Sequence, residues 1–559
     1  MFLGKNMHSS SRRERWLMVQ DTLEELKQVI LGIVPKSAGV TNIELEGPEI
    51  AVYLRNPNVL VEDTEIVKAI ARKVRKRIVV RSDPSVRLPP EEAEKIIRER
   101  VVEEAGITGI SFDNNLGEVI IEAKKPGLVI GKNGVTLREI TRATRWRPVV
   151  IRTPPISSKM VERVRGVLQA EKEKRMEFLR NVGRRIHRPL VFKNGWLRIV
   201  TLGGFREVGR TAILVQTPES SILVDCGVNV GGGGGAFPYL DLPEFDIENL
   251  DAVVVTHAHL DHSGFVPFLF KYGYDGPVYC TTPTRNLMTL LQLDYLEVAE
   301  REGKITPYSQ KDVKKAVIHT IPLEYGEVTD IAPDVRLTLH NAGHILGSAI
   351  VHLHIGDGLH NIAYTGDFKF SKTRLLEPAC NTFPRLETMI IESTYGGPED
   401  IMPSRKNAER ALVSAINETL RRGGRVLIPV LGVGRAQELM LVIEEHMRRG
   451  IIKEVPVYID GMISEATAIH TTHPEYLSRE LRERIFHHGS NPFLAACFQT
   501  VKREARLDIV EGDPCIIMAT SGMLSGGPSV EYFRLMAPDP KNSMLFVTYQ
   551  VEGTLGRRI

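Results

Sequence analysis

Residues 256–262, with the sequence THAHLDH, constrain the fold of this chain more than any other segment. An apolar run precedes them and predicts a buried strand. Alternate side chains of an extended segment share a face, so His257 and His259 are expected to point the same way at the strand end. Asp261 and His262 follow in the predicted turn, where they could serve a second metal ion. Imidazole and carboxylate ligands together favour Zn²⁺ over Mg²⁺ or Ca²⁺.

Three segments elsewhere in the chain carry further ligand-type residues next to glycines. Asp225 ends a predicted strand in Val-Asp-Cys-Gly, His344 lies in Ala-Gly-His-Ile-Leu-Gly-Ser, and Asp367 lies in Tyr-Thr-Gly-Asp-Phe. A carboxylate at Asp367 could bridge two ions. A lone histidine is usually structural, but this concentration of ligand types predicts a metal-dependent hydrolase.

These segments resemble the first four motifs of the metallo-β-lactamase-fold hydrolases. The resemblance implies an αββα sandwich that binds two Zn²⁺ ions. It implies that three histidines hold one ion, that Asp261 and His262 hold the other, and that Asp367 bridges them. Asp225 is expected to orient the histidines. The metal ligands predicted in this way are His257, His259, Asp261, His262, His344 and Asp367.

The region after residue 388 alternates strands and helices, which predicts a parallel sheet covered by helices. Residues 391–396, Ile-Glu-Ser-Thr-Tyr-Gly, resemble the first motif of the β-CASP insertion, which marks the nucleic-acid-processing branch of the superfamily. Turns at 432–438 (GVGRAQE) and 520–523 (TSGM) also match that branch. Such turns expose backbone N–H groups to phosphate. The turns supply Arg435, Ser521 and Gly522 as predicted RNA contacts.

Glu392, in the first of these motifs, is expected to be the partner of a catalytic histidine rather than a metal ligand. With this residue the predicted catalytic set comprises Asp225, Asp261 and Glu392.

An internal repeat occupies roughly residues 20–152. The segments AGVTNI (38–43) and AGITGI (105–110) correspond, and each begins a module that ends in a β-branched strand. A period near 70 residues favours two tandem domains over a solenoid.

The second module contains VIGKNG at 129–134 before a basic helix, which resembles the Gly-x-x-Gly loop of a KH domain. That loop clamps about four nucleotides of a single strand. It predicts RNA contacts at Gly131, Lys132, Asn133, Gly134 and Arg138.

The first module has Val-Glu-Asp-Thr at 61–64 in place of the glycine loop, and acidic side chains repel phosphate. This module is therefore expected either to serve in packing or to bind through Arg72, Arg75 and Lys76. A solvated, charged helix is an equally good interpretation of these cations.

The predicted fold is a multi-domain α/β protein with five parts. They are a first KH-like domain (1–70), a second KH domain (71–155), a basic linker helix (156–190), a metallo-β-lactamase domain (191–387) and a β-CASP domain (388–559). The glycine run at 231–235 lacks the Lys-Ser of a P-loop and is expected to be a flexible loop.

The composition restricts the location and partners of the chain. The 559 residues are 42% hydrophobic and carry a net charge of only +3, so a nucleic-acid surface must come from local clustering of cations. Five scattered cysteines without a Cys-x-x-Cys pair favour a reducing compartment. No apolar run approaches the ~20 residues of a membrane span, and no secretory signal is visible. A cytoplasmic location without membrane association is predicted.

From about residue 20 to residue 559 the chain resembles the archaeal homologues of the cleavage and polyadenylation specificity factor nuclease. That resemblance implies a zinc-dependent endoribonuclease, with 5′→3′ exonuclease activity as an additional option. A hydroxide activated by two metals would hydrolyse RNA phosphodiesters during RNA 3′-end formation and transcription termination. The implied partners are single-stranded RNA, RNA polymerase or other transcription machinery, and a second copy of the chain in a homodimer.

The family carries two more histidine motifs after the insertion, and neither is found here. The last histidines, His470, His473, His487 and His488, precede the TSGM turn. We therefore expect a C-terminally truncated sequence whose second metal site lacks one ligand and whose activity is low. Two other functions stay open. One is a non-catalytic RNA-binding scaffold, which the intact ligand set opposes; the other is a DNA nuclease, since KH domains also bind single-stranded DNA.

Overall fold

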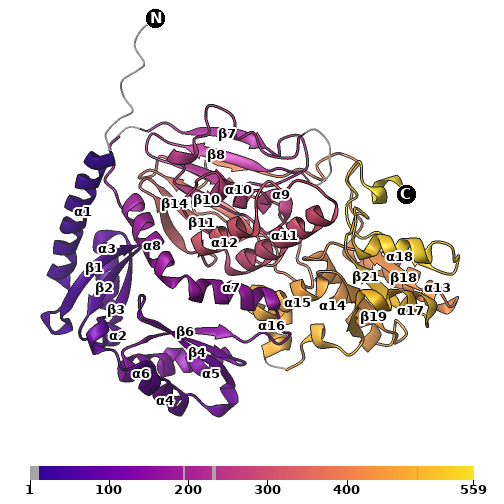
Figure 1. Ribbon diagram of the computed structural model, residues 1–559, viewed down its shortest axis with the longest axis horizontal. Helices are drawn as coiled ribbons and strands as arrows, with labels where there is room; N and C mark the ends of the chain where they lie inside the picture. Colours follow the sequence, from indigo (N-terminus) through magenta and orange to yellow (C-terminus); the bar gives the residue numbers. More distant parts are fainter. Residues whose placement is uncertain (1–11, 193–194, 230–234, 487–488) are drawn as a thin grey trace, which may run out of the picture.

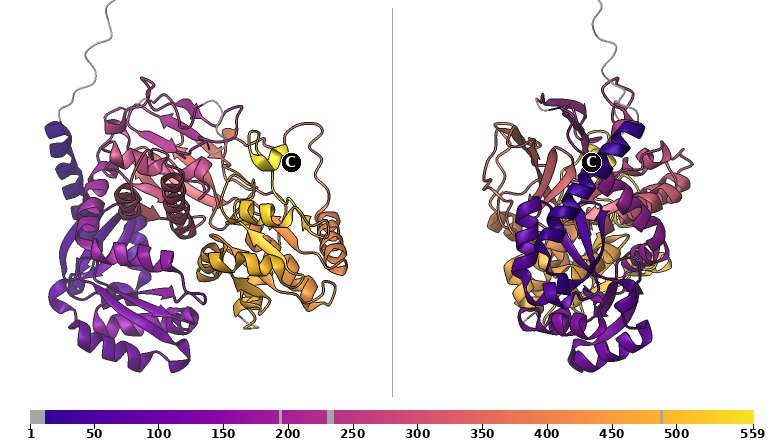
Figure 2. Two further views of the ribbon diagram at one scale, coloured as in Figure 1. Left: turned by 45° about the vertical axis from the view of Figure 1, so that its right-hand side comes forward. Right: turned by 90° about the vertical axis from the view of Figure 1, so that its left-hand side faces the viewer.

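A computed structural model describes residues 12–192, 195–229, 235–486 and 489–559, with side chains from residue 23 onward. The first eleven residues, most of the glycine run at 231–235, and His487 and His488 lie outside the described residues. The first KH module and the C-terminal α/β region lie at opposite ends of the molecule, with the hydrolase core between them (Figures 1 and 2).

The first N-terminal module packs helices on a three-stranded sheet of order β1-β2-β3. The β1 and β2 strands are antiparallel, and β2 and β3 are parallel. Because β3 belongs to this sheet, the module extends through Ser82, whereas the predicted boundary at residue 70 falls inside α3. Its elements are α1 (Arg12–Ile33), β1 (Val40–Glu46), β2 (Glu49–Leu54), α2 (Asn58–Glu62), α3 (Thr64–Val74) and β3 (Arg77–Ser82).

The second module repeats this order and these strand directions, which confirms the internal repeat. Its buried core centres on Trp146, whose indole N–H donates to the carbonyl of Leu88 at 2.9 Å. The elements are α4 (Pro90–Arg100), β4 (Ile107–Asp113), β5 (Glu118–Ala123), α5 (Pro126–Ile130), α6 (Val135–Thr144) and β6 (Arg147–Arg152).

The predicted linker helix is two helices, α7 (Lys159–Ala170) and α8 (Lys172–Ile186). Val161 and Val164 are buried, as their spacing predicts. The α7 helix contacts α11, α12 and α15, and α8 contacts β1 and β13. The linker therefore ties the N-terminal modules to both other parts of the molecule.

The hydrolase core is a sandwich of two sheets, with a shared apolar interior to which both contribute. The first has the order β12-β11-β10-β9-β8-β7 and the second runs from β13 to β17. The first consists of β7 (Arg198–Gly203), β8 (Ala212–Gln216), β9 (Ser221–Val224), β10 (Ala252–Val254), β11 (Val278–Cys280) and β12 (Thr320–Pro322). The second consists of β13 (Val328–Ala332), β14 (Val335–Asn341), β15 (Ala349–Ile355), β16 (His360–Tyr364) and β17 (Thr388–Ile390).

Four helices lie in the chain segments that connect the strands of the first sheet, and β17 differs from the predicted start of the β-CASP domain at residue 388. The helices are α9 (Leu260–Ser263), α10 (Val266–Lys271), α11 (Thr282–Arg301) and α12 (Gln310–His319). Since β17 pairs in parallel with β16, it closes the second sheet of the sandwich. The strand expected to open the β-CASP domain at 388 therefore belongs to the hydrolase core.

The C-terminal region forms a sheet of order β20-β19-β21-β18-β22 in which every pair is parallel, as predicted. The central strands β18 and β21 are buried, which explains their continuous apolar sequences. The strands are β18 (Val426–Pro429), β19 (Val457–Asp460), β20 (Phe498–Thr500), β21 (Ile516–Ala519) and β22 (Ser543–Met544). The helices are α13 (Arg405–Arg421), α14 (Arg435–Arg448), α15 (Ile463–Thr472), α16 (Arg479–Phe486), α17 (Arg506–Glu511), α18 (Pro528–Met536) and α19 (Leu555–Arg558).

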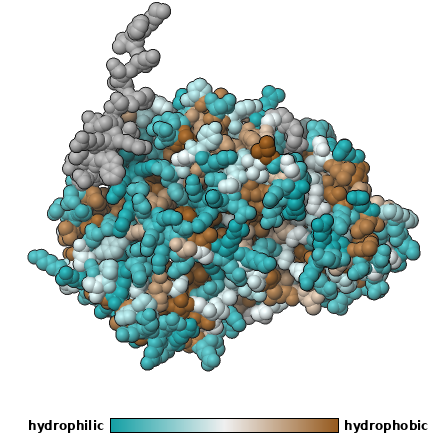
Figure 3. Space-filling view, in the orientation of Figure 1, coloured by the Kyte–Doolittle hydropathy of each residue, from teal (hydrophilic) through white to brown (hydrophobic). Residues whose placement is uncertain are grey.

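The surface is polar over most of the face shown in Figure 3, with scattered apolar side chains. Among the described helices, none combines the length and the apolar character needed to cross a membrane.

Candidate metal centre and nucleic-acid loops

Ligand-type residues converge at one edge of the sandwich because the strands that precede them end there. The β9 and β10 strands are parallel, so Asp225 and the 256–262 segment emerge side by side. The backbone N–H of Asp225 donates to the carbonyl of Val254 at 2.8 Å. His344 comes from the loop between β14 and β15, and Asp367 follows β16.

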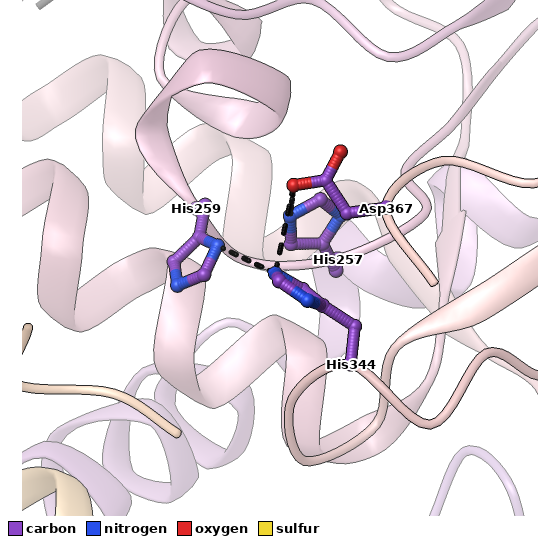
Figure 4. A group of neighbouring side chains, drawn as sticks. All are labelled: His257, His259, His344 and Asp367. Atoms are coloured by element: carbon purple, nitrogen blue, oxygen red, sulfur yellow. Dashed lines mark hydrogen bonds and ion pairs between the residues drawn. The ribbon is translucent and has the colours of Figure 1, made fainter. Parts of the chain in front are cut away.

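The first group of ligands comprises His257, His259, His344 and Asp367, whose ligand atoms all lie within 4.8 Å of one another (Figure 4). The Nε2 atom of His344 lies 3.2 Å from Nδ1 of His259 and 3.5 Å from Oδ2 of Asp367. The Nε2 atom of His257 is buried without a hydrogen-bond partner. Buried polar atoms are rarely left unpaired, so this nitrogen fits a metal ligand.

The second group comprises Asp261, His262 and Asp367. The Nε2 atom of His262 lies 3.3 Å from Oδ1 of Asp367 and 3.9 Å from Oδ2 of Asp261. Asp367 therefore turns one oxygen toward each group, which is the bridging arrangement implied by the resemblance. Among the described residues this group offers three protein ligands, one fewer than the first.

Asp225 acts on the ligands through hydrogen bonds. Fully buried, it accepts from the backbone N–H of Thr256 at 2.8 Å, from the Thr256 hydroxyl at 2.9 Å and from Nδ1 of His262 at 2.8 Å. The carboxylate is thus occupied within the protein and lies outside both ligand groups. By holding the proton of His262 on Nδ1, it leaves Nε2 free to bind a metal.

Thr256 is a positioning residue that the sequence analysis did not single out, although its place before the first histidine was a signal. Its hydroxyl donates its only hydrogen to Asp225, so it accepts from Nδ1 of His257 at 3.0 Å. This bond keeps the proton of His257 on Nδ1 and leaves the orphaned Nε2 with a free lone pair.

The electrostatics of the cluster suit cations. Burial lowers the pKa of His257 well below its usual value and that of His344 to about 3, so both are neutral ligands. Burial alone would lower the pKa of His262, but Asp367, Asp225 and Asp261 raise it well above the usual value. Burial would likewise raise the pKa of Asp367, yet the histidines hold it well below. The Asp367 carboxylate thus stays ionised and attracts positive charge.

Glu392 lies outside both metal groups. Half-buried after β17, it accepts the backbone N–H of Thr394 at 2.8 Å, while its own N–H donates to the Thr365 hydroxyl at 3.2 Å. These bonds tie the motif to the loop that carries Asp367. Its predicted role as partner of a catalytic histidine stays a prediction.

The GVGRAQE turn packs directly against the metal centre. Gly434 has a φ of 81°, and a Cβ there would lie 2.5 Å from Ile345, the neighbour of His344. Glu438 accepts the backbone N–H groups of Arg374 and Leu375 at 3.0 and 2.8 Å.

Arg435, at the start of α14, is exposed and close enough to contribute to the lowered pKa of His344, after burial and the other neighbours. The structure therefore brings this predicted RNA contact to the candidate site.

The TSGM turn packs beside the first turn. Gly522 is buried, and a Cβ there would lie 2.8 Å from the backbone nitrogen of Leu431. Ser521 is half-buried and its hydroxyl accepts the N–H of Ser525 at 2.8 Å. Gly522 thus has a packing role that the sequence analysis missed, and Ser521 is the more accessible of the two predicted contacts.

The Gly-x-x-Gly loop lies between α5 and α6, as predicted. Gly131, Asn133 and Gly134 have φ values of 72°, 54° and 71°. A Cβ at Gly131 would lie 2.3 Å from the Thr136 hydroxyl, so this position requires glycine. Lys132 and Asn133 are exposed, whereas Arg138 donates to the Asn133 carbonyl at 2.8 Å and so also supports the loop.

Family models match four segments of the chain. The KH domain of transcription termination factor FttA matches residues 20–87, and a general KH domain matches 92–166. The metallo-beta-lactamase superfamily matches 206–417, and the Beta-Casp domain matches 436–559. These matches confirm the predicted fold class: two N-terminal KH domains, a metallo-β-lactamase domain and a β-CASP domain.

Curated relatives match nearly the whole chain. Transcription termination factor FttA of Methanothermobacter thermautotrophicus is 59% identical over 97% of this chain and 86% of that protein. Those of Methanocaldococcus jannaschii and Thermococcus kodakarensis are each 58% identical, over 97% and 98% of this chain and 86% of each relative. The archaeal resemblance is thereby confirmed, and the chain belongs to the FttA family of KH-containing metallo-β-lactamase/β-CASP proteins.

Proposed function

We propose that this chain is a zinc-dependent ribonuclease that acts in transcription termination. The observation that carries the hydrolase assignment is the single carboxylate, Asp367, shared by two groups of ligands. The KH loop supports RNA as the substrate, and the name of the relatives supports the process. The orphaned Nε2 of His257 and the mixed imidazole–carboxylate ligands support zinc as the metal.

The chain's own residues would hold the metals and the strand. Zinc ions, when bound, would supply Lewis acidity toward water and toward the attacked phosphate. Thr256 and Asp225 fix the tautomers of His257 and His262, so that each presents a free nitrogen. Arg435 offers an exposed guanidinium beside the centre, whose fork suits a phosphate.

A metal-binding and cleavage assay tests this proposal. The zinc-loaded chain is given single-stranded RNA and DNA of the same sequence, and bound zinc is measured by mass spectrometry. We expect RNA cleavage that His259→Ala abolishes together with bound zinc. Asp225→Asn should lower metal affinity about 10- to 100-fold, because it loosens an orienting partner. His360→Ala is the matched control, since this histidine bonds Thr388 at 2.8 Å, outside both ligand groups.

The two competing functions predict different outcomes in the same assay. Tight RNA binding by a zinc-replete protein that cleaves nothing would identify a scaffold. Faster cleavage of DNA than of RNA would identify a DNA nuclease. The lengths of the products from end-labelled RNA distinguish endonucleolytic cleavage from 5′→3′ exonucleolytic cleavage.

The proposed partners follow from the same assignment. RNA polymerase or other transcription machinery would be bound during termination, and a second copy of the chain would form a homodimer. Light scattering after gel filtration measures the oligomeric state, and a mass equal to one chain at micromolar concentration would contradict the homodimer.

A further inference from the structure

A basic pocket of about 350 Å³ lies where the first KH module meets the hydrolase core. Arg75 and Lys76 contribute from the connection between α3 and β3, and Arg77 contributes from the start of β3. Asp330 and Arg336 contribute from β13 and β14. The two sides are brought together by the fold, because α8 contacts both β1 and β13. Figure 1 shows α8 between the first module and the hydrolase core. The pocket is separate from the metal centre and from the Gly-x-x-Gly loop.

Positive charge in this pocket exceeds what its own carboxylate can pair. Asp330 is shared by Lys76, whose Nζ is 3.3 Å away, and Arg336, whose Nε is also 3.3 Å away. The Arg75 side chain is exposed and makes no hydrogen bond or ion pair with another described residue. Arg77 is paired with Glu49 at 3.2 Å and with Glu327. Arg75, Lys76 and Arg336 are therefore three cations that face one carboxylate, Asp330.

His187 lies next to this charge cluster and is unsatisfied. Only 4% exposed, it has no hydrogen-bond partner for either ring nitrogen among the described residues. Burial, and then the ammonium of Lys76, lowers its pKa to about 4, so it is neutral near pH 7 and adds no charge of its own. The histidine is outside the residues that line the pocket, so the positive charge there comes from the arginines and Lys76.

The first KH module has no glycine loop, but it lies between this pocket and the second module and contacts that module. Glu62, at the end of α2, pairs with Arg142 of α6 at 2.9 Å. From there α3 runs for 11 residues toward the pocket, and α6 leads back from Arg142 to Val135, next to the Gly-x-x-Gly loop. The path along both helices is roughly 30 Å, a distance that an extended strand of RNA can cover.

We propose that this pocket binds a phosphate group of an RNA strand whose other part is held by the Gly-x-x-Gly loop. Two guanidinium forks and one ammonium around an open pocket are the donors that recognise phosphate oxygens. The inference rests on the proposed function only in naming RNA as the source of the phosphate. It assigns the degenerate first module a binding role that differs from that of its repeat.

The test compares two double variants that remove the same charge. The pocket variant carries Arg75→Ala and Arg336→Ala. Both guanidinium groups can be removed without leaving a buried charge unpaired, because Lys76 remains beside Asp330. Arg98→Ala with Arg449→Ala is the control, because both arginines are exposed and each pairs, among the described residues, only with the glutamate four positions earlier. Binding of a fluorescein-labelled single-stranded RNA is followed by anisotropy over a series of KCl concentrations.

The pocket variant is expected to bind RNA about tenfold more weakly, which corresponds to ~1.4 kcal/mol. The slope of log Kd against log salt should fall by about 0.7, the value for one phosphate contact on a single strand. The control should change affinity less than about twofold. Equal melting temperatures without ligand show that both variants fold.

Inorganic pyrophosphate separates the two sources of phosphate. Loss of the pyrophosphate-induced rise in melting temperature, with RNA affinity unchanged, would support a phosphate site filled by a small anion and overturn RNA as its source. No difference between pocket variant and control in either measurement would overturn the site itself. The variant Lys132→Asp with Asn133→Asp is run in parallel. If only the loop variant loses RNA binding, the proposed RNA-directed function is supported and the pocket proposal is overturned. If the unaltered chain binds no RNA, the proposed function itself is overturned.

Discussion

The two KH modules share one order of elements and one sheet topology, yet their helix connections differ in kind. In the second module three residues with positive φ open the backbone between α5 and α6 toward solvent. In the first, Asp63 makes the same connection with a φ of −111° and caps α3 by accepting the N–H of Glu65 at 3.1 Å. The comparison teaches that the core of such a module sets its fold, whereas four loop residues decide whether phosphate meets backbone N–H groups or carboxylates.

The modules are also joined through a buried ion pair that belongs to both. Arg81, on β3 of the first module, pairs with Glu46 at 2.7 Å and with Glu118 of the second module at 2.9 Å. Its pKa stays above the usual value despite burial, because the two carboxylates outweigh desolvation. The differing loops are therefore carried on one structural unit.

Breaking that junction should have the largest effect. Arg81→Met leaves the buried Glu46 with the Tyr53 hydroxyl, 2.7 Å away, as its one partner among the residues that the structure describes. Removing one member of a buried pair costs about 3–5 kcal/mol. Hydrogen exchange of β1–β3 in the full chain measures this loss, and Arg98→Ala is the control, expected to change stability by less than about 0.5 kcal/mol. A loss below about 1 kcal/mol would show that the two modules do not depend on Arg81.

The contrast between the loops is tested by charge. Lys132→Asp with Asn133→Asp should weaken RNA binding about tenfold, ~1.4 kcal/mol, because carboxylates would then face the phosphates. Glu62→Gln in the first module is the counterpart and should change affinity less than about twofold. Equal losses from both changes would mean that the modules share the strand in the same way.

The capping role of the first loop is expected to be worth less. Asp63→Ala removes the only side-chain cap of α3 and should cost about 1 kcal/mol of stability. Thermal unfolding in the absence of RNA measures it. An unchanged melting temperature, or a loss of RNA affinity larger than the loss of stability, would contradict a purely structural role for this aspartate.

The smallest effect is expected at the exposed contact between the modules. Glu62 and Arg142 lie 2.9 Å apart, but their side chains are 57% and 59% exposed, so solvent screens the pair. A double-mutant cycle with Glu62→Ala and Arg142→Ala should give a coupling of about 0.2–1 kcal/mol. The coupling should fall further in 1 M salt, where the screening length is about 3 Å. A salt-independent coupling would point to packing rather than charge.

Much of the fold followed from local patterns. The strand–helix alternation of the C-terminal region, the repeat at the N-terminus and the strand before His257 are local features, and each was predicted correctly. Two predicted boundaries, at residues 70 and 388, differ from the extent of the sheets, because β3 and β17 join sheets whose other strands lie earlier in the chain. Hydrogen bonds between distant strands leave no periodic signal in the strand itself.

The site shows the same division. Residue types and their spacing predicted which side chains gather, whereas their contacts decide what each does. Asp225 has the chemistry of a ligand, but its three hydrogen bonds turn it toward Thr256 and His262. Gly522 lies in a turn whose sequence is typical of phosphate binding, but the residue is buried against Leu431.

By itself, the sequence determined the chemical inventory: the histidines and aspartates able to hold metal, and the glycines that permit a left-handed loop at residues 131–134. Both depend on the covalent nature of single residues and their immediate neighbours. Only the tertiary structure decided that Asp367 faces two groups of ligands, and that Arg75 and Arg336 share one pocket. Such meetings depend on the burial of apolar surface between segments far apart in the chain, which brings together side chains that no local pattern relates.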